Sequence, residues 1–174
     1  MPVPNRPEAT EYSEYFETYI SLVDDTNILE ALVAQATELQ EFFSSVAASE
    51  LEVLHEPYTW TLKQVLGHCI DTERVLGYRA NCIAVSDGDN LPGFDQDLFV
   101  ANVDYSSVPI DELVEEFAVC RRSHELMFGR FSELNWSQSG TANNSVISVR
   151  SLAYLMVGHV RYHLKIVRDR VAAG

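Results

Sequence analysis

The chain has 174 residues, of which 47% are hydrophobic, and a formal charge of −14 from 12 basic and 26 acidic side chains. This length fits one compact domain with its own hydrophobic core, and we expect that single domain to span residues 1–174. The acidic surplus repels phosphate backbones and anionic lipid surfaces, which argues against nucleic acid and membrane as partners.

The N-terminal part predicts a flexible start, a short helix and a first long helix. Residues 1–10 are rich in proline, and we expect them to be flexible. Aromatic residues then recur at helical spacing from Tyr12 to Ile20, which predicts a short amphipathic lead-in helix that packs on the bundle. From about Thr26 to Ala47 the apolar residues form one stripe, typical of a bundle helix. They are Ile28, Leu29, Leu32, Val33, Ala36, Leu39, Phe42, Phe43 and Val46.

The next helix has a clear start. Thr61 as N-cap and Gln64 three residues later form a capping box, and Trp60 can pack onto Val65. This helix is expected to run to about Val85. Roughly twenty residues without helical periodicity follow, which is enough chain to cross the bundle from end to end. The helices on either side of this connection can therefore be parallel.

Two further helices complete the expected bundle. The third bundle helix starts at Pro109, has an acidic first turn, and is expected to end near Trp136. A polar loop without β-alternation follows, and Ser148 can cap the last helix, with Ile147 and Leu152 placed to pack on each other. The sequence thus predicts an all-α four-helix bundle with a short lead-in helix and a long crossover between bundle helices two and three.

His159 and His163 are four residues apart in the last helix, so both imidazoles project from one face. They share an apolar stripe with Leu152 and Ile166, where a polar group needs a partner. Core hydrogen bonds could satisfy the two rings. A metal on one nitrogen and an acceptor on the other could do so as well. The spacing alone leaves both alternatives open.

His68, on the face of the second bundle helix with Val65 and Thr72, is a third candidate. Three imidazoles are a donor set that catalytic divalent-metal sites use, with positions left open for water or substrate. His124 lies on the core stripe of the third helix, and we favour a packing or hydrogen-bonding role near the ligands for it. His55 follows the first helix in a loop and is expected at the surface.

The sequence lacks the more specific metal-binding motifs of three known classes of protein. Residues 159–163 spell His-Val-Arg-Tyr-His and lack the glutamate of the HExxH metalloproteases. Only Glu52 and His55 have Glu-x-x-His spacing, whereas a di-iron bundle needs two such pairs. The loop that contains Asp87 has Pro92 where a calcium-binding EF-hand needs glycine, so we interpret it as a solvated turn. A mononuclear site remains.

Four stretches resemble one known family in their order and in the spacing of their three histidines. They are Trp60–Arg74, Tyr78–Ala80, Leu91–Asp95 and Ser148–His163. Together they are similar to the DinB/YfiT-like superfamily of metalloenzymes over nearly the whole chain. The resemblance implies an up-down-down-up bundle. It also implies a divalent metal held by His68, His159 and His163, and we expect zinc first, with nickel as an alternative.

The resemblance implies two kinds of reaction on a small-molecule substrate. Some branches of the family are S-transferases that use bacillithiol, mycothiol or glutathione, and others are metal-dependent hydrolases. A low-molecular-weight thiol is therefore a candidate cosubstrate. The chain departs from the family pattern at Tyr162, where relatives commonly have histidine, and near Val85, where a basic residue is common. The change at Tyr162 removes a group that could support a metal ligand, and the change near Val85 alters contacts with an anion. Neither change affects the three ligands.

Other residues receive supporting roles, and no catalytic residue is assigned. His124, Tyr162 and Thr72 are candidates for hydrogen bonds around the ligands. Glu73 lies well round the helix from His68, so we expect it to form a structural ion pair, with Arg74 or Arg150 as the candidate partner.

Two hypotheses for the function stay open. The leading one is an enzyme in which a metal ion activates water or a thiol as the nucleophile. The alternative is a non-catalytic bundle that binds metal structurally or not at all and offers its acidic surface to a protein partner. A fourth protein ligand such as His124 would close the site and favour the alternative. We also expect a homodimer, formed by an apolar face left over after core packing.

The cysteines and the apolar segments predict a cytoplasmic protein. Cys69, Cys82 and Cys120 are odd in number and lack CxxC spacing, so we expect buried thiols in a reducing compartment rather than disulfides. No stretch of transmembrane length is free of charge.

Overall fold

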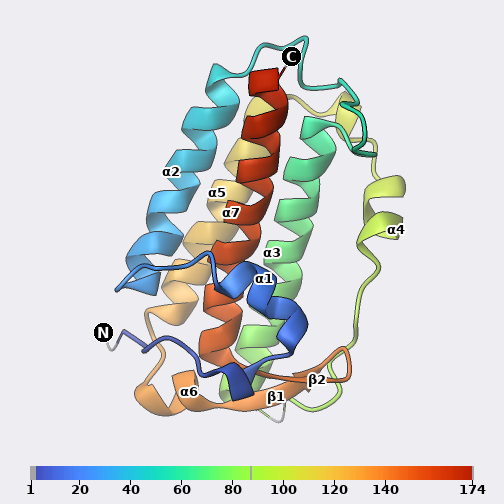
Figure 1. The fold of residues 1–174 in the computed structure, drawn as a ribbon. Helices are drawn as coiled ribbons and strands as arrows, with labels where there is room; N and C mark the ends of the chain where they lie inside the picture. Colours follow the sequence, from blue (N-terminus) through green and yellow to red (C-terminus); the bar gives the residue numbers. More distant parts are fainter. Residues whose placement is uncertain (1–2, 87, 174) are drawn as a thin grey trace.

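The computed structural model describes residues 3–86 and 88–173. Within this part, four long helices pack side by side (Figure 1). They are α2 (Ile28–Ser45), α3 (Leu62–Val85), α5 (Ile110–Phe128) and α7 (Val149–Ala173). In Figure 1, α2 and α7 run upward while α3 and α5 run downward, and both α2 and α3 contact both α5 and α7. The predicted four-helix bundle and its up-down-down-up order are confirmed.

The predicted helix starts are confirmed by their hydrogen bonds. The Thr61 side chain accepts a hydrogen bond from the Gln64 backbone N–H at 3.2 Å, and the Gln64 side chain accepts one from the Thr61 backbone N–H at 2.9 Å. Ser148 Oγ accepts a hydrogen bond from the Ser151 backbone N–H at 3.1 Å. Each such cap stabilises a helix by about 1 kcal/mol because it satisfies a backbone donor that has no partner within the helix.

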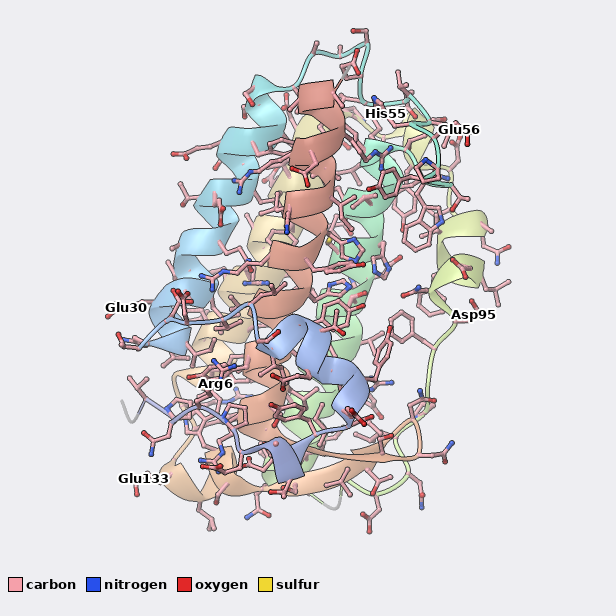
Figure 2. All side chains as sticks on the ribbon, in the orientation of Figure 1. Arg6, Glu30, His55, Glu56, Asp95 and Glu133 are labelled. Carbon is pink, nitrogen blue, oxygen red and sulfur yellow. The ribbon has the colours of Figure 1, made fainter. Side chains whose placement is uncertain are left out.

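The N-terminal segment lies against α7. It contains the 3-10 turns η1 (Ala9–Glu11) and η2 (Glu14–Phe16) and the short helix α1 (Glu17–Ile20), which confirms the lead-in helix. Arg6, labelled in Figure 2, donates a hydrogen bond to the Ile20 carbonyl at 3.0 Å, and Pro4 and Pro7 are buried. The expected flexibility of residues 1–10 stays a prediction, and residues 1–2 lie outside the described part.

Helix α1 approaches the backbone of α7 at Gly158. A Cβ atom added there would lie 2.1 Å from the Tyr19 carbonyl oxygen, a separation that real Cβ atoms do not show. Glycine therefore permits the contact that holds α1 over the middle of α7.

The Gly158→Ala substitution is expected to lower stability by about 1–3 kcal/mol because α1 must move to relieve the overlap. The sign of this change in the free energy of unfolding tests the contact, because replacing glycine with alanine in a helix interior normally stabilises a protein by roughly 1 kcal/mol. Urea unfolding of the parent and the variant measures the difference. Gly129→Ala is the matched control, because Gly129 has a right-handed helical φ of −61° that alanine adopts freely. A more stable Gly158→Ala protein would show that α1 does not pack closely.

The crossover between α3 and α5, where the sequence shows no helical periodicity, contains two short helical segments. It contains α4 (Gln96–Ala101) and the 3-10 turn η3 (Tyr105–Ser107) and runs beside α3 (Figure 1). Asp95, labelled in Figure 2, caps α4 by accepting a hydrogen bond from the Leu98 backbone N–H at 3.0 Å. Most of residues 89–99 are exposed, although Leu91 is tied down by backbone hydrogen bonds to the segment before α7. Asp87, which we placed in this turn, lies outside the described residues.

Two expectations about the region between α5 and α7 were wrong. Helix α5 ends at Phe128 rather than near Trp136, and a separate helix α6 (Glu133–Ser137) follows, with Ser132 as its N-cap. The polar loop forms an antiparallel hairpin of β1 (Ser139–Ala142) and β2 (Ser145–Ser148). Its turn is made by Asn143 and Asn144 at φ values of 49° and 61°, a conformation that asparagine tolerates well.

The cysteines agree in part with the expectation. Cys69 is buried, whereas Cys82 and Cys120 are only partly buried, and all three are free thiols. Among the described helices, none is both long enough and apolar enough to cross a membrane. The cytoplasmic location stays a prediction.

Candidate metal centre

Three histidines from two neighbouring helices meet inside the bundle. His68 comes from α3, and His159 and His163 come from successive turns of α7. One potential ligand atom from each ring can be chosen so that all three atoms lie within 4.8 Å of one another. The Nε2 atoms of His68 and His159 are 2.9 Å apart. Among the described residues, this is the one group of three or more side chains arranged to hold a metal ion.

The three imidazoles fit a divalent ion in chemistry as well as in position. Burial lowers the pKa of His68 to about 4. Burial, and then the neighbouring His68, lower the pKa of His163 to about 3. Burial and the two other histidines also lower the pKa of His159 well below its ordinary value. All three rings are therefore neutral at neutral pH, and neutral imidazole is the form that binds metals.

Aromatic rings surround the three histidines. The ring of Trp60 lies 5.0 Å from that of His68, and the ring of Tyr19 lies 5.5 Å from that of His159, measured between centroids. Tyr162 packs its ring against that of His163, with the centroids 5.3 Å apart. These rings pack around the imidazoles. The hydrogen-bonding role of Tyr162 stays a prediction.

Two cavities flank the histidines and share Tyr15, Tyr19 and Gln96. The first has a volume of about 290 Å³, and His68 and His159 are part of its wall. The second has a volume of about 360 Å³, and it is lined by His163 and several aromatic side chains. Those aromatic side chains are Tyr15, Tyr19, Tyr58, Trp60 and Tyr162. Two adjoining cavities thus border the histidine cluster.

Thr72 also lines the first cavity, one helical turn after His68. Its Oγ1 is buried and has no hydrogen-bond partner among the described residues. A buried hydroxyl without a partner is costly, so a ligand in this cavity is a natural partner for it. The supporting role of Thr72 stays a prediction, and the position of its side chain in the cavity wall is consistent with that role.

His124 lies outside the group of three and is engaged elsewhere. Its Nδ1 is 3.1 Å from Glu73 Oε2, and Arg121 Nη2 donates a hydrogen bond to Glu73 Oε1 at 2.7 Å. All three side chains are buried. Burial alone would raise the pKa of Glu73, but the charge of Arg121 and the hydrogen bond of His124 outweigh it, so this pKa is lowered.

The expected partners of Glu73 were wrong. Arg74 pairs with Glu116, and Arg150 pairs with Glu11. Glu73 instead faces α5, where Arg121 and His124 lie. The expectation of a structural ion pair was right, but its partner depends on how α3 and α5 are rotated against each other, which a single sequence does not reveal.

His55 lies in the loop after α2, near the end of the bundle where α3 begins (Figure 2). It is more enclosed than expected, because only 17% of its side chain is exposed. Its Nε2 lies 3.4 Å from a Glu50 carboxylate oxygen, and its Nδ1 lies 3.3 Å from Nη2 of Arg170.

Arg79 lines the first cavity with Phe94, and we did not predict a role for it from the sequence. Arg79 is buried, donates a hydrogen bond to the Pro92 carbonyl at 2.7 Å, and lies 6.0 Å from the centroid of the Phe94 ring. Helical spacing could have indicated it. His68, Thr72, Leu76 and Arg79 follow one another at intervals of four, four and three residues and so share a helix face.

Comparisons with known proteins agree with the fold. A model of the DinB superfamily matches residues 31–167. YfiT from Bacillus subtilis, described as a probable metal-dependent hydrolase with an unusual four-helix bundle topology, matches with a TM-score of 0.72 and 14% identity. This match covers 95% of this chain and 90% of YfiT. No curated protein matches the sequence.

Two structures of the mycothiol-dependent maleylpyruvate isomerase, one of them a mutant, also match. Their TM-scores are 0.62 and 0.61, with 10% and 12% identity. Each match covers 83% of this chain but only 59% of the isomerase chain. At these identities the likeness establishes a common bundle fold.

Proposed function

The chain belongs to the DinB superfamily, and from this membership and the histidine cluster we propose that it is a mononuclear metal-dependent enzyme acting on a small molecule. The observation that carries the proposal is the convergence of His68, His159 and His163 beside two cavities. A structural core needs neither three facing imidazoles nor two cavities beside them.

The three imidazole nitrogens would hold Zn²⁺, with Ni²⁺ as the second candidate, because both ions accept nitrogen donors. A divalent ion at such a site lowers the pKa of a bound water or thiol and so supplies a nucleophile near neutral pH. The chain contributes neutral donors on two packed helices, and the rings of Tyr19 and Trp60 keep those donors in place.

An open site is supported by the position of His124. A fourth protein ligand would favour the structural alternative, because structural zinc sites are closed by four protein ligands. His124 is held by Glu73, and among the described residues no fourth side chain joins the group of three. This arrangement favours catalysis over a purely structural metal.

The second cavity favours thiol transfer over hydrolysis. Water needs no cavity of its own, whereas a low-molecular-weight thiol must bind beside the electrophilic substrate. The cavity next to His163 offers about 360 Å³ for it. The isomerase that matches the fold is described as mycothiol-dependent, which also supports this version. The description of YfiT supports hydrolysis, which stays the alternative.

The predicted homodimer remains part of the proposal. Val33 on α2 and Leu126 on α5 are 47% and 59% exposed, and they line the same groove between these helices. Apolar side chains of this kind are what a second copy of the chain would cover.

Zinc-loaded protein is expected to conjugate glutathione, bacillithiol or mycothiol to a chlorodinitroarene, and His159→Ala to lower kcat/KM at least about a hundredfold. Product formation measured by absorbance checks this for each thiol, and hydrolysis of a nitrophenyl ester without thiol is measured beside it. His55→Ala serves as control for the loss of a histidine. Faster ester hydrolysis than thiol transfer would favour the hydrolase, and turnover unchanged by His159→Ala would contradict both versions.

A further inference from the structure

The first cavity, like the second, has no acidic side chain in its described lining, although the protein as a whole is strongly acidic. The chain carries 26 acidic and 12 basic side chains, yet none of the described residues that line this cavity is Asp or Glu. Arg79 is the one arginine or lysine among the described residues of this lining. In a strongly acidic protein, a cavity without carboxylates is suited to an anion.

Arg79 is a buried cation with few partners. It is only 5% exposed, and its hydrogen bond to the Pro92 carbonyl uses one of the five N–H donors of a guanidinium. Its Nε is buried and has no acceptor among the described residues, which is also true of the Nε atoms of Arg121 and Arg170. None of the ion pairs of the described residues involves Arg79. Burying a charge without a counter-charge is costly, and burial lowers the pKa of Arg79 accordingly.

Arg121 shows one way in which the chain stabilises a buried arginine. It is as deeply buried as Arg79, but it is paired with the Glu73 carboxylate and donates to the carbonyls of Leu32 and Met156. Arg79 differs in lining a cavity instead of facing a glutamate. Arg170 is also buried without a carboxylate partner among the described residues, but it donates to the carbonyls of Val53 and Trp60. Arg79 donates to one carbonyl and lines a cavity, so we expect a ligand to supply its further acceptors.

We propose that the first cavity binds a compact substrate through a carboxylate group held by Arg79, with the apolar part of the substrate against Leu76, Phe94 and Leu155 and its reactive end toward His68 and His159. One guanidinium balances one negative charge and matches the planar shape of a carboxylate. The volume of about 290 Å³ limits the ligand to a small molecule. The reactive end rests on the proposed function, whereas the anion contact rests on Arg79 alone.

Calorimetric titration of zinc-loaded protein with benzoate and hexanoate, and with their neutral amides, tests the proposal. The parent is expected to bind the acids at least tenfold more tightly than the amides. Arg79→Met should weaken acid binding by about tenfold to a hundredfold and leave amide binding unchanged, because only the charge-assisted hydrogen bond is lost. Arg79→Lys keeps the charge and should retain part of the affinity.

The control is Arg122→Met, which removes the same charge from a side chain that is 61% exposed. It should change acid affinity less than twofold. Zinc content is measured for every protein, so that a lost metal is not mistaken for a lost anion contact. An Arg79→Met protein with full zinc and unchanged acid affinity would overturn the anion site and leave the metal enzyme standing.

Two further outcomes are also decisive. If the parent holds no zinc, the proposed function fails, while the dependence of acid binding on Arg79 still decides the anion site. If Arg79→Met does not fold, the acid and amide affinities of the parent and of Arg79→Lys decide whether the anion site exists. Equal affinities of the parent for acids and amides would then overturn the proposal. A clear preference for the acids that persists in metal-free protein and that Arg79→Lys retains in part would support it.

Discussion

Replacing Glu73 with alanine is expected to destabilise the folded protein by about 3–5 kcal/mol, since it leaves the buried Arg121 without its counter-charge. Glu73 on α3 holds Arg121 and His124 of α5, and Arg121 also donates to the carbonyls of Leu32 on α2 and Met156 on α7. This one network joins all four bundle helices, so its loss loosens the whole bundle.

Urea unfolding at neutral pH measures this change, with Glu116→Ala as the matched control. Glu116 pairs with Arg74 at the surface, and exposed pairs contribute about 0–1 kcal/mol. The pKa of Glu73 is lowered on folding, so its stabilisation is present above its ordinary pKa of 4.5 and is lost as the pH falls through the folded value. The difference in the free energy of unfolding between the parent and Glu73→Ala should therefore become smaller at acidic pH. Equal effects of the two substitutions would contradict the network.

Replacing His163 with alanine is expected to weaken zinc binding by about a hundredfold or more, because even residues that merely support a metal ligand change affinity by 10–100-fold. Competition titration with a chromophoric chelator measures the affinity. His68→Ala, which removes a donor from the other helix, should have an effect of the same size, since the two rings lie 4.9 Å apart and face one site.

His124→Ala is the informative control for this prediction, because His124 is buried but bonded to Glu73. Zinc affinity should change only a few-fold when it is removed. A loss as large as that of His163→Ala would make His124 a fourth ligand and favour a closed, structural site.

The bundle could be predicted from the sequence because its signals are local. The capping box at Thr61 and the apolar stripes of the long helices depend on residues three or four apart, and the length of the crossover indicated parallel helices. The hairpin before α7 was missed because its strands are only four residues each, too short for a clear alternation. The asparagines at 143 and 144 were its one strong turn signal.

Only those residues of the candidate site whose placement follows from their spacing along one helix could be predicted from the sequence pattern. The spacing of His159 and His163 placed both rings on one face, and the family resemblance joined His68 to them. The partners of Glu73 and the wall made by Tyr19 depend on how separate segments pack, which no local pattern encodes. Arg79 was within reach, because it shares the helix face of His68 and Thr72.

The most direct test of the account is the metal content of the protein purified without a histidine tag, determined by elemental mass spectrometry beside the His159→Ala variant. The account predicts about one equivalent of a divalent ion, zinc or nickel, in the parent and little in the variant. A parent that holds no ion, even after reconstitution with Zn²⁺, Ni²⁺, Mn²⁺ and Fe²⁺, would contradict the account and leave the three histidines as core residues.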